Sequence, residues 1–220
     1  MNHILEFDSI RLSFGERVIL SDVYMKCETG KITGLLGRNG QGKSCLFNII
    51  YGELAAEERS IRFDKLSFGQ AYKRPDLLLF LPQFSFIPKA FAIGRVFDDF
   101  DLDYQELEKR FPEFRSKHRQ QFKNLSGGES RFIQTYIVLK AKSQFAILDE
   151  PFTHLMPLQI EKMAELIKEE KQYKGLLITD HIYRIIVDLA DDLYLLTGGK
   201  THRVTALTDI EDLGYAIAIP

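Results

Sequence analysis

The sequence GRNGQGKS, at residues 37–44, decides the fold of this 220-residue chain. It matches the pattern Gly-x-x-x-x-Gly-Lys-Ser and follows the apolar run KITGLL, residues 31–36, which predicts a buried strand. The apolar segment Cys45 to Tyr51 comes next and predicts a helix. A glycine-rich loop between a strand and a helix turns its N–H groups toward phosphate oxygens. The stretch therefore predicts a nucleotide-phosphate site in an α/β protein.

The side chains of this loop have the chemistry that a nucleotide requires. Lys43 can reach the β- and γ-phosphates, and the Ser44 hydroxyl can be a ligand to Mg²⁺. The helix that follows presents its positive end to the same anion. The nucleotide-binding residues predicted from the loop are Gly37, Asn39, Gly40, Gly42, Lys43, Ser44 and Cys45.

A pair of acids follows a second buried strand. In FAILDEP, residues 145–151, four apolar residues precede Asp149 and Glu150. The carboxyl ends of strands are where open α/β sheets bind ligands. We expect Asp149 to hold Mg²⁺ and Glu150 to orient or deprotonate the attacking water. Paired acids after a strand are a weak signal alone, but they become strong downstream of a phosphate loop.

The rest of the chain alternates strand and helix patterns. Residues 4–14 have strand alternation, Gly15-Glu16 predicts a hairpin turn, and residues 60–83 have β-rich composition. Residues 176–179 and 193–196 predict buried strands, and residues 197–200 a hairpin turn. Helices are expected at residues 95–122 (interrupted by Pro112), 130–142 and 158–173, the last ending at Gly175. This order predicts a parallel α/β sheet with an antiparallel layer at the N-terminal side.

Several further motifs occur in the order of one family. Residues Asn124 to Glu129 contain LSGGE, which closely resembles the signature of ABC ATPases and falls between the phosphate loop and the acidic pair. Phe14 resembles the aromatic residue that stacks on adenine. Gln83, in LFLPQ, resembles the glutamine of the Q-loop, and His181, in LLITDH, resembles the switch histidine. The resemblance extends over essentially the whole chain.

The resemblance implies a P-loop NTPase core with an antiparallel β subdomain and a small helical subdomain, about residues 84–130, in a single ABC ATPase domain, residues 1–220. It implies hydrolysis of ATP with Mg²⁺, with Glu150, His181 and Gln83 as catalytic residues and Ser44, Gln83 and Asp149 at the metal. In the family, two chains hold two ATP molecules head to tail, so Ser126, Gly127 and Gly128 would act in trans on the nucleotide of a partner. That partner is a second copy or a second ABC ATPase.

The segment after Glu150 departs from the family pattern. Met156 stands where relatives usually have an aspartate that carries information between the two nucleotide sites, and a thioether cannot replace a carboxylate. Communication between the sites is therefore in question, although the hydrolytic residues are present.

Phenylalanine is concentrated in one part of the chain. Nine of the 17 lie between Phe80 and Phe122. They predict either the core of a small helical lobe or an apolar groove beside Gln83 that accepts a helix of a permease. The residues expected in the groove are Phe84, Phe86 and Phe91.

Composition limits the function classes. There are 29 basic and 31 acidic residues, with no long run of one sign, so we expect no nucleic-acid partner. The N-terminus has no signal-peptide pattern, and no stretch approaches the roughly 18–20 apolar residues of a membrane span. The two cysteines, Cys27 and Cys45, have no metal or disulfide spacing. We expect a cytoplasmic protein held at the inner face of the membrane through a transmembrane permease.

Three functions remain open. The first is the ATP-hydrolysing motor of a transporter. The second is a soluble ABC ATPase that drives assembly, for example of iron–sulfur clusters, or remodelling. The third, suggested by Met156, is a nucleotide-binding switch with little turnover.

Overall fold

The N-terminal part of the chain forms an antiparallel sheet. The computed structural model describes residues 2–212. In this sheet the strand order is β2-β1-β5-β6, and β3 also pairs with β1. Strand β1 (Ile4–Phe14) turns at Gly15-Glu16 into β2, as predicted, with Phe14 paired to Arg17. The other strands of the sheet are β2 (Arg17–Leu20), β3 (Tyr24–Glu28), β5 (Glu58–Phe63) and β6 (Leu66–Ser67).

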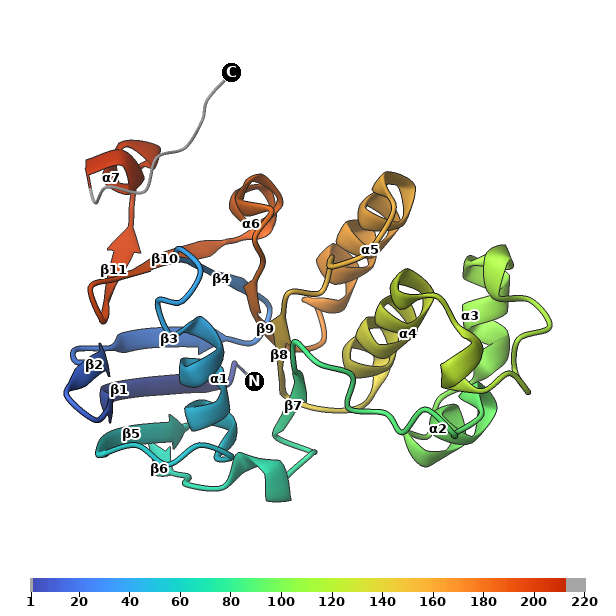
Figure 1. Cartoon of the computed structure of the whole chain (residues 1–220), viewed down its shortest axis with the longest axis horizontal. Coiled ribbons are helices and arrows are strands. Elements are labelled where there is room, and N and C mark those ends of the chain that lie inside the picture. The colour runs from blue at the N-terminus through green and yellow to red at the C-terminus, as the bar shows by residue number, and fades with distance from the viewer. Residues whose placement is uncertain (1, 213–220) are drawn as a thin grey trace.

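A second sheet of six strands forms the centre of the molecule (Figure 1). Its order is β11-β10-β4-β9-β8-β7, and all neighbours are parallel except β10 and β11. The predicted buried strands are confirmed, because every residue of β4, β8 and β9 is buried. The strands are β4 (Ile32–Leu36), β7 (Leu78–Leu81), β8 (Phe145–Asp149), β9 (Gly175–Thr179), β10 (Asp192–Thr197) and β11 (Lys200–Val204).

Helices cover the parallel sheet. Helix α1 lies between the two sheets, whereas α4, α5 and α6 lie on the other side, with α2 and α3 beyond them (Figure 1). Pro112 interrupts the helical segment as expected, since it begins a short 3₁₀ turn after α3. The α-helices are α1 (Lys43–Tyr51), α2 (Ile93–Asp99), α3 (Tyr104–Arg110), α4 (Gly127–Lys140), α5 (Pro157–Glu170), α6 (Tyr183–Leu189) and α7 (Leu207–Asp212). The 3₁₀ helices are η1 (Ala71–Lys73), η2 (Pro112–Phe114) and η3 (Phe122–Asn124).

Two hydrophobic cores hold these layers together. One joins α1 to both sheets, through residues such as Phe7, Phe47 and Ile147. The other joins the opposite face of the parallel sheet to α2, α3, α4, α5 and α6. The predicted α/β fold with an antiparallel layer is confirmed. None of the helices between residues 2 and 212 is long and apolar enough to cross a membrane.

Some predicted elements need correction. Gly175 does not end the helix before it, because α5 ends at Glu170 and Gly175 is the first residue of β9. A Cβ at Gly175 would lie 2.5 Å from the Phe145 ring and 2.8 Å from the Glu28 carbonyl, so close packing explains this glycine. The segment predicted as β-rich, residues 60–83, contains 3₁₀ helix η1 between its strands. Strand β3 and helix α6 were not predicted.

Candidate functional site

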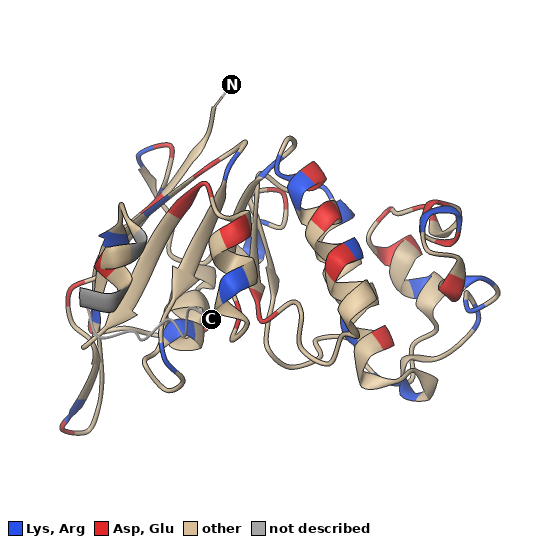
Figure 2. Ribbon diagram, turned by 90° about the horizontal axis from the view of Figure 1, so that it is seen from above, with Lys and Arg blue, Asp and Glu red and all other residues tan. Residues whose placement is uncertain are grey.

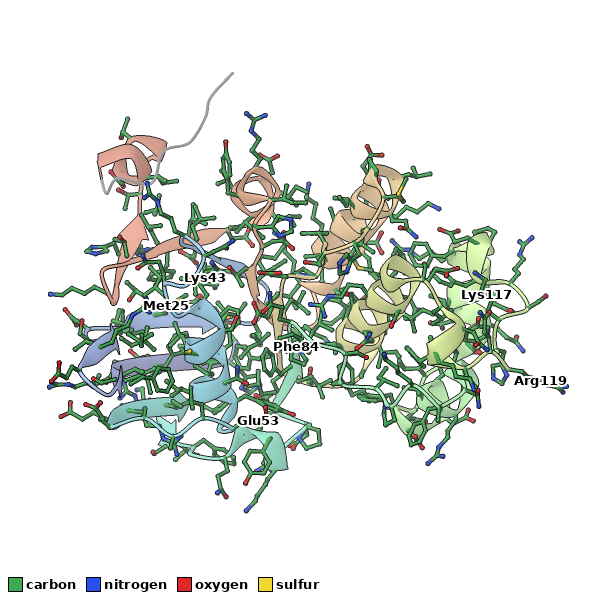
Figure 3. All side chains as sticks on the ribbon, viewed as in Figure 1. Met25, Lys43, Glu53, Phe84, Lys117 and Arg119 are labelled. Carbon is green, nitrogen blue, oxygen red and sulfur yellow. The ribbon has the colours of Figure 1, made fainter. Side chains whose placement is uncertain are left out.

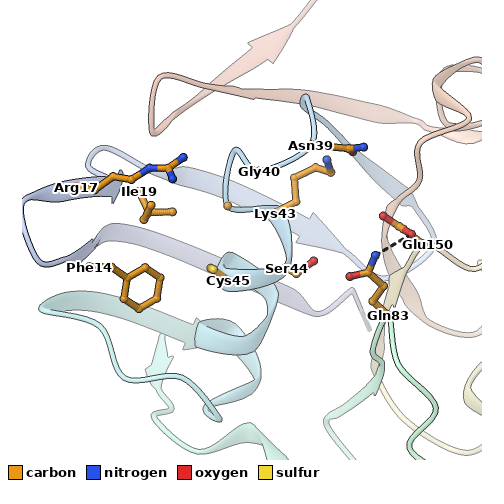
Figure 4. Close-up of a pocket in the computed structure, with 11 residues that line it drawn as sticks. Phe14, Arg17, Ile19, Asn39, Gly40, Lys43, Ser44, Cys45, Gln83 and Glu150 are labelled. Carbon is orange, nitrogen blue, oxygen red and sulfur yellow. Dashed lines mark hydrogen bonds between the residues drawn. The ribbon is translucent and has the colours of Figure 1, made fainter.

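The predicted phosphate loop lines a cavity of about 560 Å³ between the antiparallel sheet and the end of β8. Figure 4 shows Phe14, Arg17 and Ile19 at one end of this cavity, and Gln83 and Glu150 at the other. The complete lining is Phe14, Arg17, Ile19, Asn39, Gly40, Gly42, Lys43, Ser44, Cys45, Gln83 and Glu150.

Gly42 shapes the junction between the loop and helix α1. Gly42, the N-cap of α1, has φ 102°, and a Cβ there would also lie 2.8 Å from the Ile19 side chain. The cap has no side-chain hydrogen bond, and no acidic side chain lies in the first turn of α1. The N–H groups of this turn therefore offer a positive site to an anion.

Lys43 places a buried positive charge beside these N–H groups. Its ammonium donates to the carbonyls of Gly37, at 2.7 Å, and Arg38, at 3.3 Å. Burial lowers the pKa of Lys43, whereas Asp149 and Glu150 favour its charged form. Gly37, the first residue of the loop, is buried and does not line the cavity.

Asp149 meets the requirements of a magnesium ligand. Its side chain is buried beside Ser44, whose hydroxyl hydrogen-bonds it, and its Oδ2 atom has no partner among the described residues. Burial raises the pKa of Asp149 to about 6, against the opposing effect of the Ser44 hydrogen bond. Among the side chains that the structure describes, no group of three or more His, Cys, Asp or Glu could hold a metal ion. An ion at Ser44 and Asp149 would therefore complete its shell with phosphate oxygens and water, as Mg²⁺ commonly does.

Glu150 is fixed at the entrance to the same cavity. Its carboxylate accepts hydrogen bonds from the Gln83 amide, at 3.1 Å (Figure 4), and from the Thr153 hydroxyl, at 3.2 Å. The residue has φ 57°, a left-handed conformation that is uncommon outside glycine and often occurs at functional sites. The structure therefore brings Gln83 and Glu150 together, although they are 67 positions apart.

Six predicted residues lie outside the cavity lining: Gly37 and Asp149, described above, and His181, Ser126, Gly127 and Gly128. The His181 side chain is 51% exposed, and its Nδ1 atom lies 3.1 Å from Asp180 Oδ1. Ser126 and Gly127 are exposed, and Gly128 is partly exposed, at the start of α4. In the structure of one chain, none of the last four residues lines the cavity with the phosphate loop.

The signature sequence also has a local structural role. Ser126 is the N-cap of α4, and its hydroxyl accepts from the Glu129 N–H at 3.2 Å. The Glu129 carboxylate accepts from the Ser126 N–H at 2.8 Å and pairs with Lys117. This arrangement is a capping box, which the spacing Ser-x-x-Glu could have predicted.

Arg17 and Ile19 are lining residues that sequence reasoning missed. Both lie on β2, whose register with β1 pairs Arg17 with Phe14. The Phe14 side chain is 55% exposed, so one face is available to a flat ligand. The hairpin alone could have indicated that Arg17 neighbours Phe14.

Asp180 is a further residue whose role sequence reasoning missed. It is buried, and its two carboxylate oxygens accept from the N–H groups of Phe152 and Ile182, each at 3.0 Å. It therefore joins the segment after Glu150 to the segment that carries His181. Its place directly after a buried strand repeats the pattern of Asp149, which is a signal that the sequence contains.

The phenylalanines between residues 80 and 122 mainly form core. Of the three expected in a groove, only Phe84 is strongly exposed, at 81%. Phe86 packs against the ring of Phe100, and Phe91 lies beneath the guanidinium of Arg95. Figure 3 shows Phe84 on the segment that leaves β7.

Met156 is exposed on the surface that follows the acidic pair. It is the N-cap of α5, and its side chain is 67% exposed. Its N–H donates to Gln159 Oε1 at 3.0 Å, so the backbone is capped without an aspartate.

Comparison with known proteins agrees with the motifs. The family model described as ABC transporter matches residues 20–153. A probable ABC transporter ATP-binding protein of Azorhizobium caulinodans is 30% identical over 201 residues, which cover 85% of this chain and 72% of that protein. The lipopolysaccharide export system ATP-binding protein LptB of Acidithiobacillus ferridurans is 28% identical, over 96% of this chain and 94% of that protein.

Solved structures share the fold. The ATP-binding subunit of an ABC transporter superposes with a TM-score of 0.79 and 21% identity, covering 96% of this chain and 94% of that one. A bacterial Atm1-family ABC exporter with ATP bound gives a TM-score of 0.82 and 17% identity, over 96% of this chain and 40% of that one. With the cavity, the ordered motifs and the matched family model, the chain belongs to the ABC transporter ATPases, as an ATP-binding and ATP-hydrolysing subunit.

Proposed function

We propose that this chain is the motor subunit of a membrane transporter. It binds ATP with Mg²⁺ in the cavity, closes head to tail on a second ABC ATPase domain, and drives a separate transmembrane permease. One observation carries the proposal: the phosphate loop and Glu150 share a cavity, while the signature residues Ser126 and Gly127 are exposed elsewhere on the same chain. Residues 1–220 would act as one ABC ATPase domain with a helical subdomain at about residues 84–130.

ATP would lie along the cavity with its adenine at the Phe14 end and its phosphates toward the start of α1. The adenine stacks on Phe14, and the phosphates reach the N–H groups at the start of α1 and the ammonium of Lys43. Ser44 and Asp149 hold Mg²⁺, together with Gln83. The ion would offset the charge that develops on the phosphate oxygens.

Glu150 would direct the hydrolysis itself. Its carboxylate orients a water for in-line attack on the γ-phosphate and accepts a proton from it. The Gln83 amide and the Thr153 hydroxyl hold that carboxylate in place. His181 completes the site when its segment closes on the γ-phosphate, and the Asp180 carboxylate joins the main chain at Ile182, beside it, to the main chain at Phe152.

The second chain supplies what this cavity lacks. The start of α4 is a helix N-terminus whose capping box fixes Ser126, with Ser126 and Gly127 exposed and Gly128 partly exposed. Such a terminus can bind the γ-phosphate held by another chain, so ATP joins the two chains and its hydrolysis releases them.

The transmembrane partner would contact the exposed segment beside Gln83. Phe84 is a large apolar side chain left in solvent next to a residue that touches Glu150. A permease helix that covers Phe84 would therefore act close to the hydrolytic carboxylate. Named relatives include an export system and a hemin import protein, so the proposal extends to transport at the inner face of the membrane and names no cargo.

Charge supports a protein partner over a nucleic acid. Lys, Arg, Asp and Glu are interspersed along the ribbon in Figure 2, and the formal net charge is −2. Binding to a polyanion uses a concentrated positive surface.

Affinity purification from the native cells tests the partner. We expect a multi-span membrane protein to co-purify with the tagged wild type and with Tyr173→Ser, a matched exposed aromatic that lies outside the Gln83 segment. Phe84→Ser should recover several-fold less of it. Recovery of cytosolic partners alone would contradict the transporter proposal and favour an assembly or remodelling ATPase.

Phosphate release tests the chemistry separately. We expect steady turnover by the wild type and a loss of about 100-fold or more in Glu150→Gln, because removing an activating group commonly costs 10²–10⁴-fold. Negligible turnover by the purified wild type with its partner present would instead indicate a nucleotide-binding switch.

A further inference from the structure

Arg131 is a charged side chain inside the molecule whose partners are main-chain carbonyls. It lies on α4, two residues after the capping glutamate, and it is 5% exposed. Its guanidinium donates to the carbonyls of Pro82, at 2.7 Å, and Glu150, at 3.1 Å, and to that of Asp149. One side chain of the signature helix is therefore bonded to the two strand ends that form the hydrolytic part of the cavity.

The bonded carbonyls lie next to the residues proposed to act on the water. Pro82 directly precedes Gln83, and Asp149 and Glu150 are the acidic pair themselves. The Gln83 amide bonds the Glu150 carboxylate at 3.1 Å, a contact that requires the two strand ends to keep a fixed separation. Arg131 bonds the main chain of both strand ends from α4.

A second side chain of α4 holds the other end of the Gln83 segment. Gln134 is 2% exposed, and its Oε1 atom accepts from the Phe86 N–H at 3.2 Å. Its amide nitrogen donates to Ser130 Oγ at 2.9 Å, which fixes its orientation. Residues 82–86 are thus bonded to α4 at both ends, with Gln83 and the exposed Phe84 between the two bonds.

The guanidinium suits this role better than other side chains. It presents several N–H donors in a rigid planar fork, so it can bond divergent carbonyls at once, which a lysine ammonium on a flexible stem does less well. Burial lowers the pKa of Arg131 to about 10, against the favourable effect of Asp149, so the group is charged at neutral pH. Its charge lies near Asp149, Asp180 and Glu150.

We infer that Arg131 is a positioning residue that links the signature helix to hydrolysis by holding the Gln83 segment and the Glu150 strand end in one geometry. This inference rests on the proposed roles of Glu150 and Gln83. A shift of α4, or of Phe84 under a partner, then changes the position of Glu150 through Arg131, without any contact between Arg131 and the nucleotide.

Steady-state kinetics of Arg131→Met and Arg131→Lys test the inference. ATP turnover is expressed per bound nucleotide, so that an unfolded fraction does not count. We expect kcat to fall at least about tenfold in Arg131→Met with KM within about threefold of wild type, because misplacing a catalytic group by about 1 Å can cost 10²-fold. Arg131→Lys should recover part of kcat. Arg110→Met, which removes an exposed pair with Glu169, is the matched control and should keep kcat.

A double-mutant cycle distinguishes positioning from general damage. If Arg131 acts through the Gln83 segment, Arg131→Met combined with Gln83→Ala should lower kcat about as much as the larger single change, because both remove one arrangement. Multiplying effects would contradict the inference, as would wild-type kcat in Arg131→Met. Should that variant not fold, Arg131→Gln replaces it, and failure of both to fold would assign Arg131 a structural role and overturn the inference.

The proposed function can fail separately. If Glu150→Gln hydrolyses ATP at the wild-type rate, the role of Glu150 is wrong whatever Arg131 does. If Glu150→Gln is inactive while Arg131→Met keeps the wild-type kcat, only the present inference is wrong.

Discussion

Phe14 is the residue whose exposure invites a direct test of ATP binding. The residue is 55% exposed and lies at one end of the cavity that the phosphate loop lines. Base stacking on an aromatic side chain contributes about 1–3 kcal/mol. We therefore predict that Phe14→Ala raises the Kd for ATP about tenfold, measured by equilibrium titration with a fluorescent ATP analogue.

Phe14→Tyr is the control for this change, since it keeps the ring face and should bind within about twofold of wild type. An ATP affinity in Phe14→Ala that equals the wild type would show that the adenine lies elsewhere.

Lys174 carries a buried charge that makes stability depend on pH. The residue is 3% exposed, its ammonium donates to the Ala141 carbonyl at 2.6 Å, and burial lowers its pKa to about 8. Between pH 8 and the ordinary lysine value of 10.5, the unfolded chain keeps a proton that the folded chain has lost. The contribution of Lys174 to the free energy of unfolding therefore increases as pH rises through that window.

We predict that the stability of wild type relative to Lys174→Met increases from pH 7.5 to pH 10, measured by urea unfolding at each pH. Lys142→Met, at an exposed lysine, is the comparison variant. A difference in unfolding free energy between wild type and Lys174→Met that stays constant, or that falls as pH rises, would contradict the lowered pKa of Lys174.

At the scale of elements, the N-terminus of α4 combines a structural cap with a proposed function in trans. Ser126 caps α4, and Asp103 caps α3 by accepting from the Gln105 N–H at 2.8 Å. Losing such a cap costs about 1 kcal/mol. We predict that Ser126→Ala and Asp103→Ala lower stability by similar amounts in denaturant melts, whereas only Ser126→Ala lowers ATP turnover, by about tenfold.

Equal turnover in the two cap variants would mean that Ser126 only stabilises its helix. Asp103 serves as the control because it caps a helix of the same lobe without belonging to the signature segment.

The elements that the sequence predicts well are those with local causes. The phosphate loop needs glycines and a lysine at fixed spacing, and β4, β8 and β9 are continuous apolar runs, so each is readable without knowledge of the fold. Strand β3 was missed although Met25 and Cys27 alternate with more exposed residues, because five residues give a weak periodic signal.

The features that the sequence did not predict depend on tertiary contacts. Gly175 looked like a helix end, but the Phe145 ring and the Glu28 carbonyl explain it, and both are distant in sequence. Arg131 was not singled out within the helix predicted at residues 130–142, yet its guanidinium bonds the carbonyls of Pro82, Asp149 and Glu150.

At the scale of the whole molecule, the nucleotide cavity and the signature segment, which the proposal assigns to one catalytic site, lie on different parts of the chain. The cavity contains the phosphate loop and Glu150, and a second core carries α4 with its exposed N-terminus. A single chain therefore presents one nucleotide cradle and, on another surface, one signature. Two chains arranged head to tail would complete both sites, with Met156 exposed near the acidic pair instead of an aspartate.

The most direct test of this account is the mass in solution of Glu150→Gln, with and without ATP and Mg²⁺, by light scattering. Because the variant should bind ATP without hydrolysing it, we predict a shift from the 25.4 kDa of one chain to twice that mass when ATP is present. The change should be absent with ADP and absent when Lys43→Ala is added. If the second ABC ATPase domain belongs to a different chain, we expect ATP to join one copy of each chain when that chain is added. A variant that binds ATP yet keeps the mass of one chain, alone and with any such partner, would contradict the account.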